Sequence, residues 1–229
     1  VFEVSAVDDV DPAPVVTADP ASGSVFPIGE TVVTVTATDA AENSSEASFL
    51  VTVVDMTDSE GPYSGVVGTQ ADPYRISRVA DWVELMGAPL DWSKHFILTT
   101  NLYFGGMELT PVGNSATKFS GTLEGHGYFL RNAIIDQPDG WYVGVFGQLG
   151  AGKLKRLGAE NITVKGYGCV GVMVGLLGQN GEIVDSYAAG TVSGSDYIGG
   201  LVGAQSTSSS ILASHAMVDV SGNAHVGGL

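Results

Sequence analysis

The chain has 229 residues, of which 44% are hydrophobic and 15% are charged, a composition that excludes a disordered polyelectrolyte. The formal net charge is −16, and no basic cluster is present that would neutralise phosphates, which excludes nucleic acid as a partner. Because no apolar run approaches the roughly 18 residues of a membrane span, we expect no membrane insertion within this fragment. The single cysteine, Cys169, excludes an intrachain disulfide and a multi-cysteine metal site.

A shift in charge divides the sequence into domains. Residues 1–60 hold twelve of the 25 acidic residues and none of the nine basic ones, and such an asymmetry marks a domain boundary. We therefore expect a first domain at residues 1–55, a linker at 56–62, a leader and cap at 63–142, and repeats at 143–229. The chain opens Val-Phe-Glu without an initiator methionine, so we also expect an internal fragment of a larger protein.

The first domain shows the alternation of half-buried strands. In residues 32–38 and 48–54 apolar side chains recur at every second position, with turn residues between the two runs. Val33 and Phe49 are expected on apolar faces of these strands. Short strands separated by turns predict a β-sandwich, and the segment lacks the His, Lys or Cys that covalent catalysis uses.

Residues 18–43, ADPASGSVFPIGETVVTVTATDAAEN, resemble the hyalin-repeat (HYR) domain. The resemblance covers about residues 1–55 and implies an immunoglobulin-like sandwich of extracellular and adhesive proteins. Since the family's first strand would lie before Val1, we expect a truncated copy. Glu42 stands where the family usually has glycine, which leaves open whether this turn keeps the φ > 0 geometry that glycine serves.

Four acidic side chains in the first domain offer an alternative interpretation as calcium ligands, because hard cations prefer several carboxylate oxygens. No D-x-[DN]-x-[DN]-G loop accompanies them, and a solvated acidic rim explains them as well. We commit to no metal and no cofactor. The four residues are Asp8, Asp9, Asp11 and Asp39.

One amphipathic helix is predicted near residues 78–86. Ser77 is placed to cap its N-terminus and Gly87 to end it. The expected apolar face is Val79, Trp82, Val83 and Met86, at positions i, i+3, i+4 and i+7. We interpret the helix as a cap on the open end of a solenoid.

Three columns of residues recur every 28 positions in the second half of the chain, and this spacing indicates a solenoid repeat. Glycine is too frequent for helical repeats, so each repeat should be a β coil of two or three strands, with glycine supplying φ > 0 at the corners. The first copy carries an extra residue, which we assign to a loop, so that Leu154 takes the place of Ile183. Val192 should lie in the stacked core and Asp196 in an outer corner. The columns are Gly147, Gly175 and Gly203; Gly166, Gly194 and Gly222; and Val164, Val192 and Val220.

The segments 170–183, VGVMVGLLGQNGEI, and 198–203, IGGLVG, resemble the GLUG motif of bacterial surface and secreted proteins. Segments 72–76, 92–98 and 119–128 resemble the leader that precedes such repeats. The likeness covers about residues 63–229 and implies a right-handed β-helix of large adhesins, or a non-catalytic part of secreted proteases.

Catalytic chemistry has little support in the sequence. The four histidines show no metal-binding spacing, and Cys169 is expected to pack as a small core residue. The nearest pair of carboxylates is Asp136 and Asp139, beside Trp141 and Tyr142, which can stack on sugar rings; the segment also reads as a turn. The histidines are His95, His126, His215 and His225.

We therefore expect an all-β chain: a truncated Ig-like sandwich followed by a capped parallel β-helix. Its function is interpreted as a non-catalytic stalk or adhesion segment, extracellular or on the bacterial cell surface, monomeric, with an extracellular protein or glycan as partner. Two alternatives stay open: a polysaccharide-active β-helix enzyme, and an accessory region of a secreted protease.

Overall fold

A computed structural model describes residues 2–27, 29–53, 63 and 67–229. The chain forms two compact units, Val1–Val54 and Asp55–Leu229, which are described separately. The predicted linker at residues 56–62 lies outside the described residues. Within the described residues, no helix is long and apolar enough to cross a membrane.

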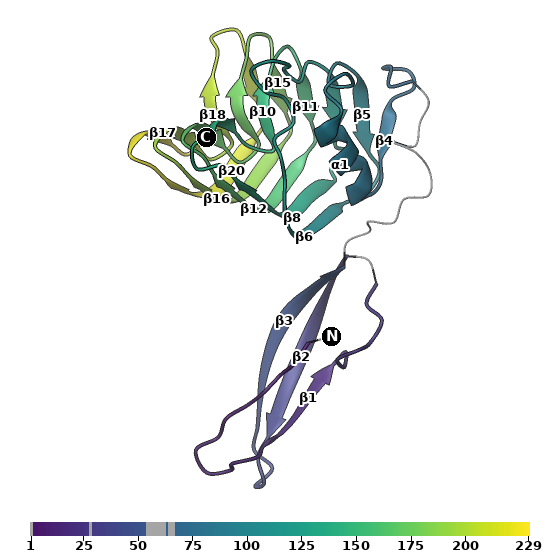
Figure 1. The fold of residues 1–229 in the computed structure, drawn as a ribbon, viewed down its shortest axis with the longest axis vertical. Coiled ribbons are helices and arrows are strands. Elements are labelled where there is room, and N and C mark those ends of the chain that lie inside the picture. Colours follow the sequence, from purple (N-terminus) through teal and green to yellow (C-terminus); the bar gives the residue numbers. More distant parts are fainter. Residues whose placement is uncertain (1, 28, 54–62, 64–66) are drawn as a thin grey trace. The chain divides into compact units, whose positions relative to one another are not determined.

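The first unit is an antiparallel sheet of three strands, β1 (Val15–Asp19), β2 (Gly29–Thr38) and β3 (Ser44–Val53), in the order β1-β2-β3 (Figure 1). Val33 is fully buried and lies opposite Phe49 in the register. Phe2 packs edge-on against Phe49, with the ring centroids 5.0 Å apart. The predicted alternation is confirmed, and the single described sheet accords with a truncated Ig-like sandwich.

The β2–β3 turn keeps a left-handed residue without glycine. Glu42 has φ +65°, so the geometry left open by the sequence is present with a glutamate. The Asp39 carboxylate holds the turn by accepting hydrogen bonds from the backbone N–H groups of Ala41 and Asn43, both at 2.8 Å, and from the Asn43 amide. The Asn43 side chain is the main cause that lowers the pKa of Asp39.

We predict that Glu42→Gly makes the first unit more stable by about 0.5–1 kcal/mol, because an L side chain in the left-handed region costs energy that glycine avoids. Hydrogen exchange of the β2 and β3 amides measures this unit directly. Glu46→Gly, in the extended strand β3, is the matched control and should lower protection. Equal effects of the two changes would show that Glu42 carries no backbone strain.

The second unit is a β-solenoid of four parallel sheets (Figure 1). The first sheet contains β4 (Tyr74–Ile76), β5 (His95–Leu98), β7 (Thr122–Glu124), β11 (Lys153–Lys155), β15 (Glu182–Val184) and β19 (Ser210–Leu212). The second contains β6 (Leu102–Glu108), β8 (Phe129–Asp136), β12 (Gly158–Lys165), β16 (Tyr187–Ser193) and β20 (His215–Ser221). The third contains β9 (Trp141–Val143), β13 (Gly168–Gly171), β17 (Asp196–Gly199) and β21 (Ala224–Gly227). The fourth contains β10 (Phe146–Leu149), β14 (Val174–Leu177) and β18 (Val202–Gln205).

Each complete coil has four strands, so the prediction of two or three strands per coil is wrong. The coil from Glu182 to Gln205, for example, consists of β15, β16, β17 and β18. The strands are only three to seven residues long here, because short connections turn the chain after each of them. More corners therefore fit into 28 residues than the sequence suggested.

The predicted register is confirmed along the axis. Val164, Val192 and Val220 pair as neighbours in β12, β16 and β20, and Leu154 pairs with Ile183. Val192 is 1% exposed, so the column does fill the core. A Val at the same level of each coil completes the core of its neighbour.

The extra residue of the first copy lies inside a strand, which corrects its assignment to a loop. The register between β12 and β16 shifts between Ala159 and Ile162, where Asn161 has φ +48°. This is a β-bulge, which accommodates one extra residue by bending the strand. The Asn161 side-chain amide donates to the Asn132 side-chain oxygen of the preceding coil at 2.7 Å, so the bulge is stacked on a second left-handed asparagine, with φ +60°.

The column glycines have another purpose than the predicted φ > 0 corners. Gly147, Gly175 and Gly203 do not adopt left-handed φ. A Cβ added at each of them would lie 2.3–2.4 Å from a backbone atom of an adjacent segment, which is closer than any Cβ can approach. The left-handed corners of the third sheet are occupied by other residues instead. These are Tyr142, Cys169, Tyr197 and His225, with φ between +50° and +62°.

A single helix, α1 (Val79–Gly87), covers the N-terminal end of the solenoid beside β4 (Figure 1). Trp82 lies at the centre of this cap, with its ring centroid 6.0 Å from that of Phe146 and 6.2 Å from that of Phe104. The Trp92 indole N–H donates to the Leu85 carbonyl at 2.8 Å. The helix and its capping role are thus as predicted.

Two details of the helix differ from the sequence prediction. The N-cap is Arg78 rather than Ser77, and Gly87 is the last helical residue rather than the residue that follows it. The cause is Asp81, which is buried and accepts hydrogen bonds from the backbone N–H groups of Ser77 and Arg78 at 2.7 and 3.0 Å. The buried face is Val79, Asp81, Trp82 and Leu85. Val83 is exposed and Met86 only partly buried.

We predict that Val192→Ala destabilises the solenoid by about 1–3 kcal/mol, from lost transfer energy and the cavity left between coils. Asp196→Ala should cost less than about 1 kcal/mol, because a partly exposed ion pair contributes little. Asp196 is the first residue of β17 rather than part of a corner, and its carboxylate lies 2.6 Å from His225 Nδ1. Denaturant unfolding at equal slope, followed by tryptophan fluorescence, compares the variants; equal losses would show that the axial register is wrong.

Candidate functional site

The predicted acidic pair lies on the surface of the solenoid. Asp136 is the exposed last residue of β8, and Asp139 is exposed in the turn closed by a hydrogen bond from Gly140 N–H to the Gln137 carbonyl, at 2.8 Å. The turn interpretation of this segment is confirmed. Trp141 and Tyr142 follow directly in β9, with their ring centroids 6.2 Å apart.

The candidate calcium ligands are engaged in turn hydrogen bonds. Asp8 accepts from the N–H groups of Val10 and Asp11 at 2.9 and 2.6 Å, and the Asp11 carboxylate accepts from Ala40 N–H at 2.9 Å. Asp8, Asp11 and Asp39 line one hollow of about 280 Å³, which does not include Asp9. Within the described part of the chain, no group of three or more His, Cys, Asp or Glu residues is arranged to hold a metal ion.

The histidines lie apart from one another, as their sequence spacing predicts. His95 is part of β5, and His126 is in a turn with φ +53°, where its N–H donates to Glu124 at 2.9 Å. His215 stacks on Tyr187, with the centroids 5.7 Å apart, and His225 stacks on Tyr197 at 4.5 Å. These contacts are between coils, so they contribute to stacking.

Cys169 is a free and buried cysteine, 7% exposed. Burial, followed by the negative charge of Asp196, raises the pKa of its thiol. A raised pKa keeps the thiol protonated and unreactive. The prediction that Cys169 packs as a core residue is confirmed.

The structure brings together an aromatic group that the sequence analysis saw only in part. In the third sheet, Trp141 pairs with Gly168, which pairs with Asp196 and then Ala224. The residues on either side of this row therefore also lie in successive coils. We call the aromatic side chains gathered there the aromatic strip. Its members, from the first coil to the fourth, are Trp141 and Tyr142, Tyr167, Tyr197, and His225.

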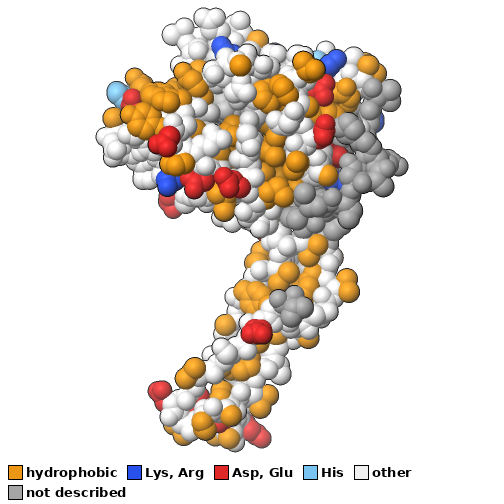
Figure 2. Space-filling model, in the orientation of Figure 1, with side chains coloured by type: hydrophobic (Ala, Val, Ile, Leu, Met, Phe, Trp, Pro, Cys, Tyr) orange, Lys and Arg blue, Asp and Glu red, His pale blue; other side chains and the backbone are white. Residues whose placement is uncertain are grey.

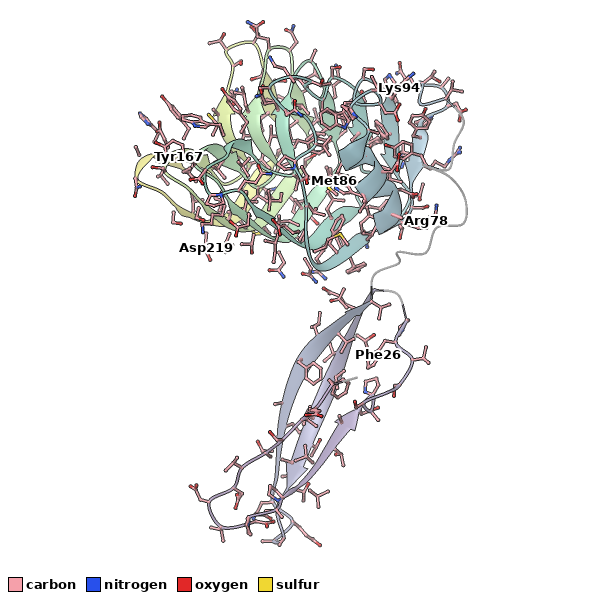
Figure 3. The ribbon with its side chains drawn as sticks, viewed as in Figure 1. Phe26, Arg78, Met86, Lys94, Tyr167 and Asp219 are labelled. Carbon is pink, nitrogen blue, oxygen red and sulfur yellow. The ribbon has the colours of Figure 1, made fainter. Side chains whose placement is uncertain are left out.

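Three rings of the aromatic strip are largely exposed: Trp141 at 48%, Tyr167 at 44% and Tyr197 at 42%. Figure 2 shows hydrophobic side chains beside a histidine at the margin of the solenoid where Figure 1 labels β17, and Figure 3 labels Tyr167 at this margin. The sequence analysis named Trp141 and Tyr142 only. The register places Tyr197 and His225 in line with Tyr142, so the 28-residue repeat contained the signal.

Comparison with known proteins identifies relatives of this chain. Residues 1–53 match the HYR domain family. Halomucin from Haloquadratum walsbyi is 32% identical over 175 residues, which is 72% of this chain but 2% of that protein. A protein described as a Gly-rich membrane protein, from Evansella cellulosilytica, is 33% identical over 134 residues, 54% of this chain and 15% of the relative. No solved structure gives a significant match.

The chain thus spans only a small fraction of the curated relatives it matches. The HYR match confirms the predicted resemblance of the first unit, and both named relatives are consistent with surface-protein repeats. Together with the all-β fold, these findings indicate a cell-surface or extracellular protein whose residues 1–53 are an HYR domain.

Proposed function

We propose that the chain is a non-catalytic stalk and adhesion segment of a bacterial secreted or cell-surface protein. The observation that carries this proposal is the axial register: equivalent residues pair from coil to coil through β12, β16 and β20. Continuous parallel pairing makes a stiff body that gains length with each coil. The GLUG resemblance of segments 170–183 and 198–203 supports the same function, since that motif is repeated in such proteins.

The interior of the solenoid favours a structural function over catalysis. Among the described residues, only Asp81, Gln148 and Ser186 are buried polar or charged side chains. Asp81 supports the start of α1. Ser186 Oγ donates to the Val184 carbonyl at 2.8 Å and accepts from Leu157 N–H at 3.2 Å. A catalytic centre needs groups in a shaped, water-excluding site, whereas these side chains stabilise the backbone.

The polysaccharide-active enzyme is the second candidate, because Asp136 and Asp139 lie near exposed aromatic rings. Both candidates are tested by incubating the chain with a panel of neutral and acidic polysaccharides. We expect no reducing ends and no unsaturated sugars to be released. Release that is lost in Asp136→Ala and kept in Asp72→Ala, an acidic residue before β4, would overturn the proposal. An accessory role beside a protease domain is compatible with the absence of release.

A further inference from the structure

The aromatic strip presents a periodic surface along the solenoid axis. Successive coils of the third sheet contribute Trp141, Tyr167, Tyr197 and His225 to the same margin. The coils are separated by the parallel strand spacing of about 4.8 Å, which is close to the length of one pyranose ring. A chain of sugar rings running along the axis would therefore meet one aromatic side chain per coil.

The rings are held in place by their neighbours. A Cβ added to Gly168 would lie 2.7 Å from the six-membered ring of Trp141, so the indole lies across the bare backbone of the next coil. Its centroid is 5.4 Å from that of Tyr167. Tyr197 stacks on His225 with an angle of 5° between the rings, and Asp196 holds the imidazole at 2.6 Å. Rings that are already fixed lose little entropy when a ligand binds.

Polar groups line the same surface. Ser195 and Asn223 occupy the row next to Asp196 in the third and fourth coils, and Asn223 Nδ2 donates to Ser195 Oγ at 3.3 Å. Hydroxyl, amide and carboxylate groups beside aromatic faces match the alternation of hydroxyls and C–H faces on a sugar chain. Asp196, together with the net charge of −16, disfavours an anionic ligand.

We propose that the aromatic strip binds a neutral polysaccharide chain, with the glycan lying along the solenoid axis. Trp141 and Tyr167 stack on adjacent sugar rings, and Ser195, Asp196 and Asn223 bind hydroxyl groups further along the chain. The binding is non-catalytic and adds a ligand class to the stalk.

Intrinsic fluorescence suits the test, because Trp82 and Trp92 are 1% and 3% exposed whereas Trp141 is 48% exposed. The full chain is titrated with cellohexaose, laminarihexaose and chitohexaose, and with hexagalacturonate as an anionic probe. At least one neutral hexasaccharide should change the tryptophan emission, and hexagalacturonate should not. Protection of Trp141 from acrylamide quenching should accompany binding.

Calorimetry then compares variants whose melting temperatures match the parent chain. Trp141→Ala and Tyr167→Ala should each weaken the binding of the neutral hexasaccharide by about three- to tenfold. Met217→Ala, which removes a 66% exposed apolar side chain from β20, should leave the affinity unchanged. The proposal is wrong if no neutral hexasaccharide binds, or if both strip variants bind as tightly as the parent. Self-association that Trp141→Ala abolishes, without glycan binding, would assign the aromatic strip to a second copy instead.

Discussion

Gly175→Ala should destabilise the solenoid by about 3 kcal/mol or more. Gly175 is buried in β14, and a Cβ there would lie 2.4 Å from the Tyr142 carbonyl carbon and 2.5 Å from Val143 N. These are backbone atoms of another strand, so relief requires the coils to move apart. Denaturant unfolding followed by tryptophan fluorescence measures the loss, since all three tryptophans belong to the second unit.

Gly87→Ala is the matched control for this prediction. The position is the last residue of α1, and an added Cβ would meet no atom within 4 Å. Alanine has the higher helix propensity, so this variant should be equally stable or more stable by up to about 1 kcal/mol. If the two alanine variants lost similar stability, close packing of coils would not explain the glycine columns.

Phe146→Ala should cost about 3–5 kcal/mol, the usual range for removing a buried aromatic side chain. Phe146 is fully buried, and its ring contacts those of Phe119 and Trp82, with centroids 5.1 and 6.0 Å away. It therefore joins the helical cap to the interior of the solenoid. Loss of the ring should weaken the packing of α1, visible as faster hydrogen exchange of the helix amides.

Two controls separate packing from a general effect of substitution. Phe146→Leu keeps most of the apolar volume and should cost less than about 1.5 kcal/mol. Leu90→Ala removes a side chain that is 90% exposed and should change stability by less than about 0.5 kcal/mol. A small loss in Phe146→Ala would mean that the cap packs independently of this ring.

The all-β class, the solenoid and its axial register were predictable from the sequence. Spacing of 28 residues identifies which residues stack, because equivalent positions of a repeat occupy equivalent places. The pairing of Val192 with Val220 follows from that spacing alone. The handedness of the coil stays a prediction from the GLUG resemblance.

The reasons for individual residues were less predictable. Glycine serves both left-handed φ and close backbone approach, and the sequence does not separate these uses; only the contacts around Gly175 do. Likewise, several apolar residues compete for the buried face of α1. The contacts of Trp82 with Phe104 and Phe146 select Leu85 rather than Val83 and Met86.

The aromatic strip was missed for a geometric reason. Tyr167 lies just before β13, whereas Tyr197 lies inside β17, so the two do not share a repeat position. Only the solenoid corner brings both rings to one margin with Trp141. Surface clusters that combine different repeat positions require the structure of the coil, including its four short strands.

The central claim is that the coils stack one strand spacing per repeat in a stiff solenoid. Arg75 and Leu212 lie in one column of the six-stranded sheet, five strand spacings apart, and Val184 is four spacings from Arg75. Double electron–electron resonance between spin labels on cysteines at these sites, in a Cys169→Ala background, measures both distances.

At about 4.8 Å per spacing, the backbone separations are about 24 Å for Arg75 and Leu212 and about 19 Å for Arg75 and Val184. The label linkers contribute similarly to both pairs, so the difference of about 5 Å is the decisive quantity. The stacked solenoid predicts this difference with narrow distributions for both pairs. Equal distances, or broad distributions that overlap, would contradict the account.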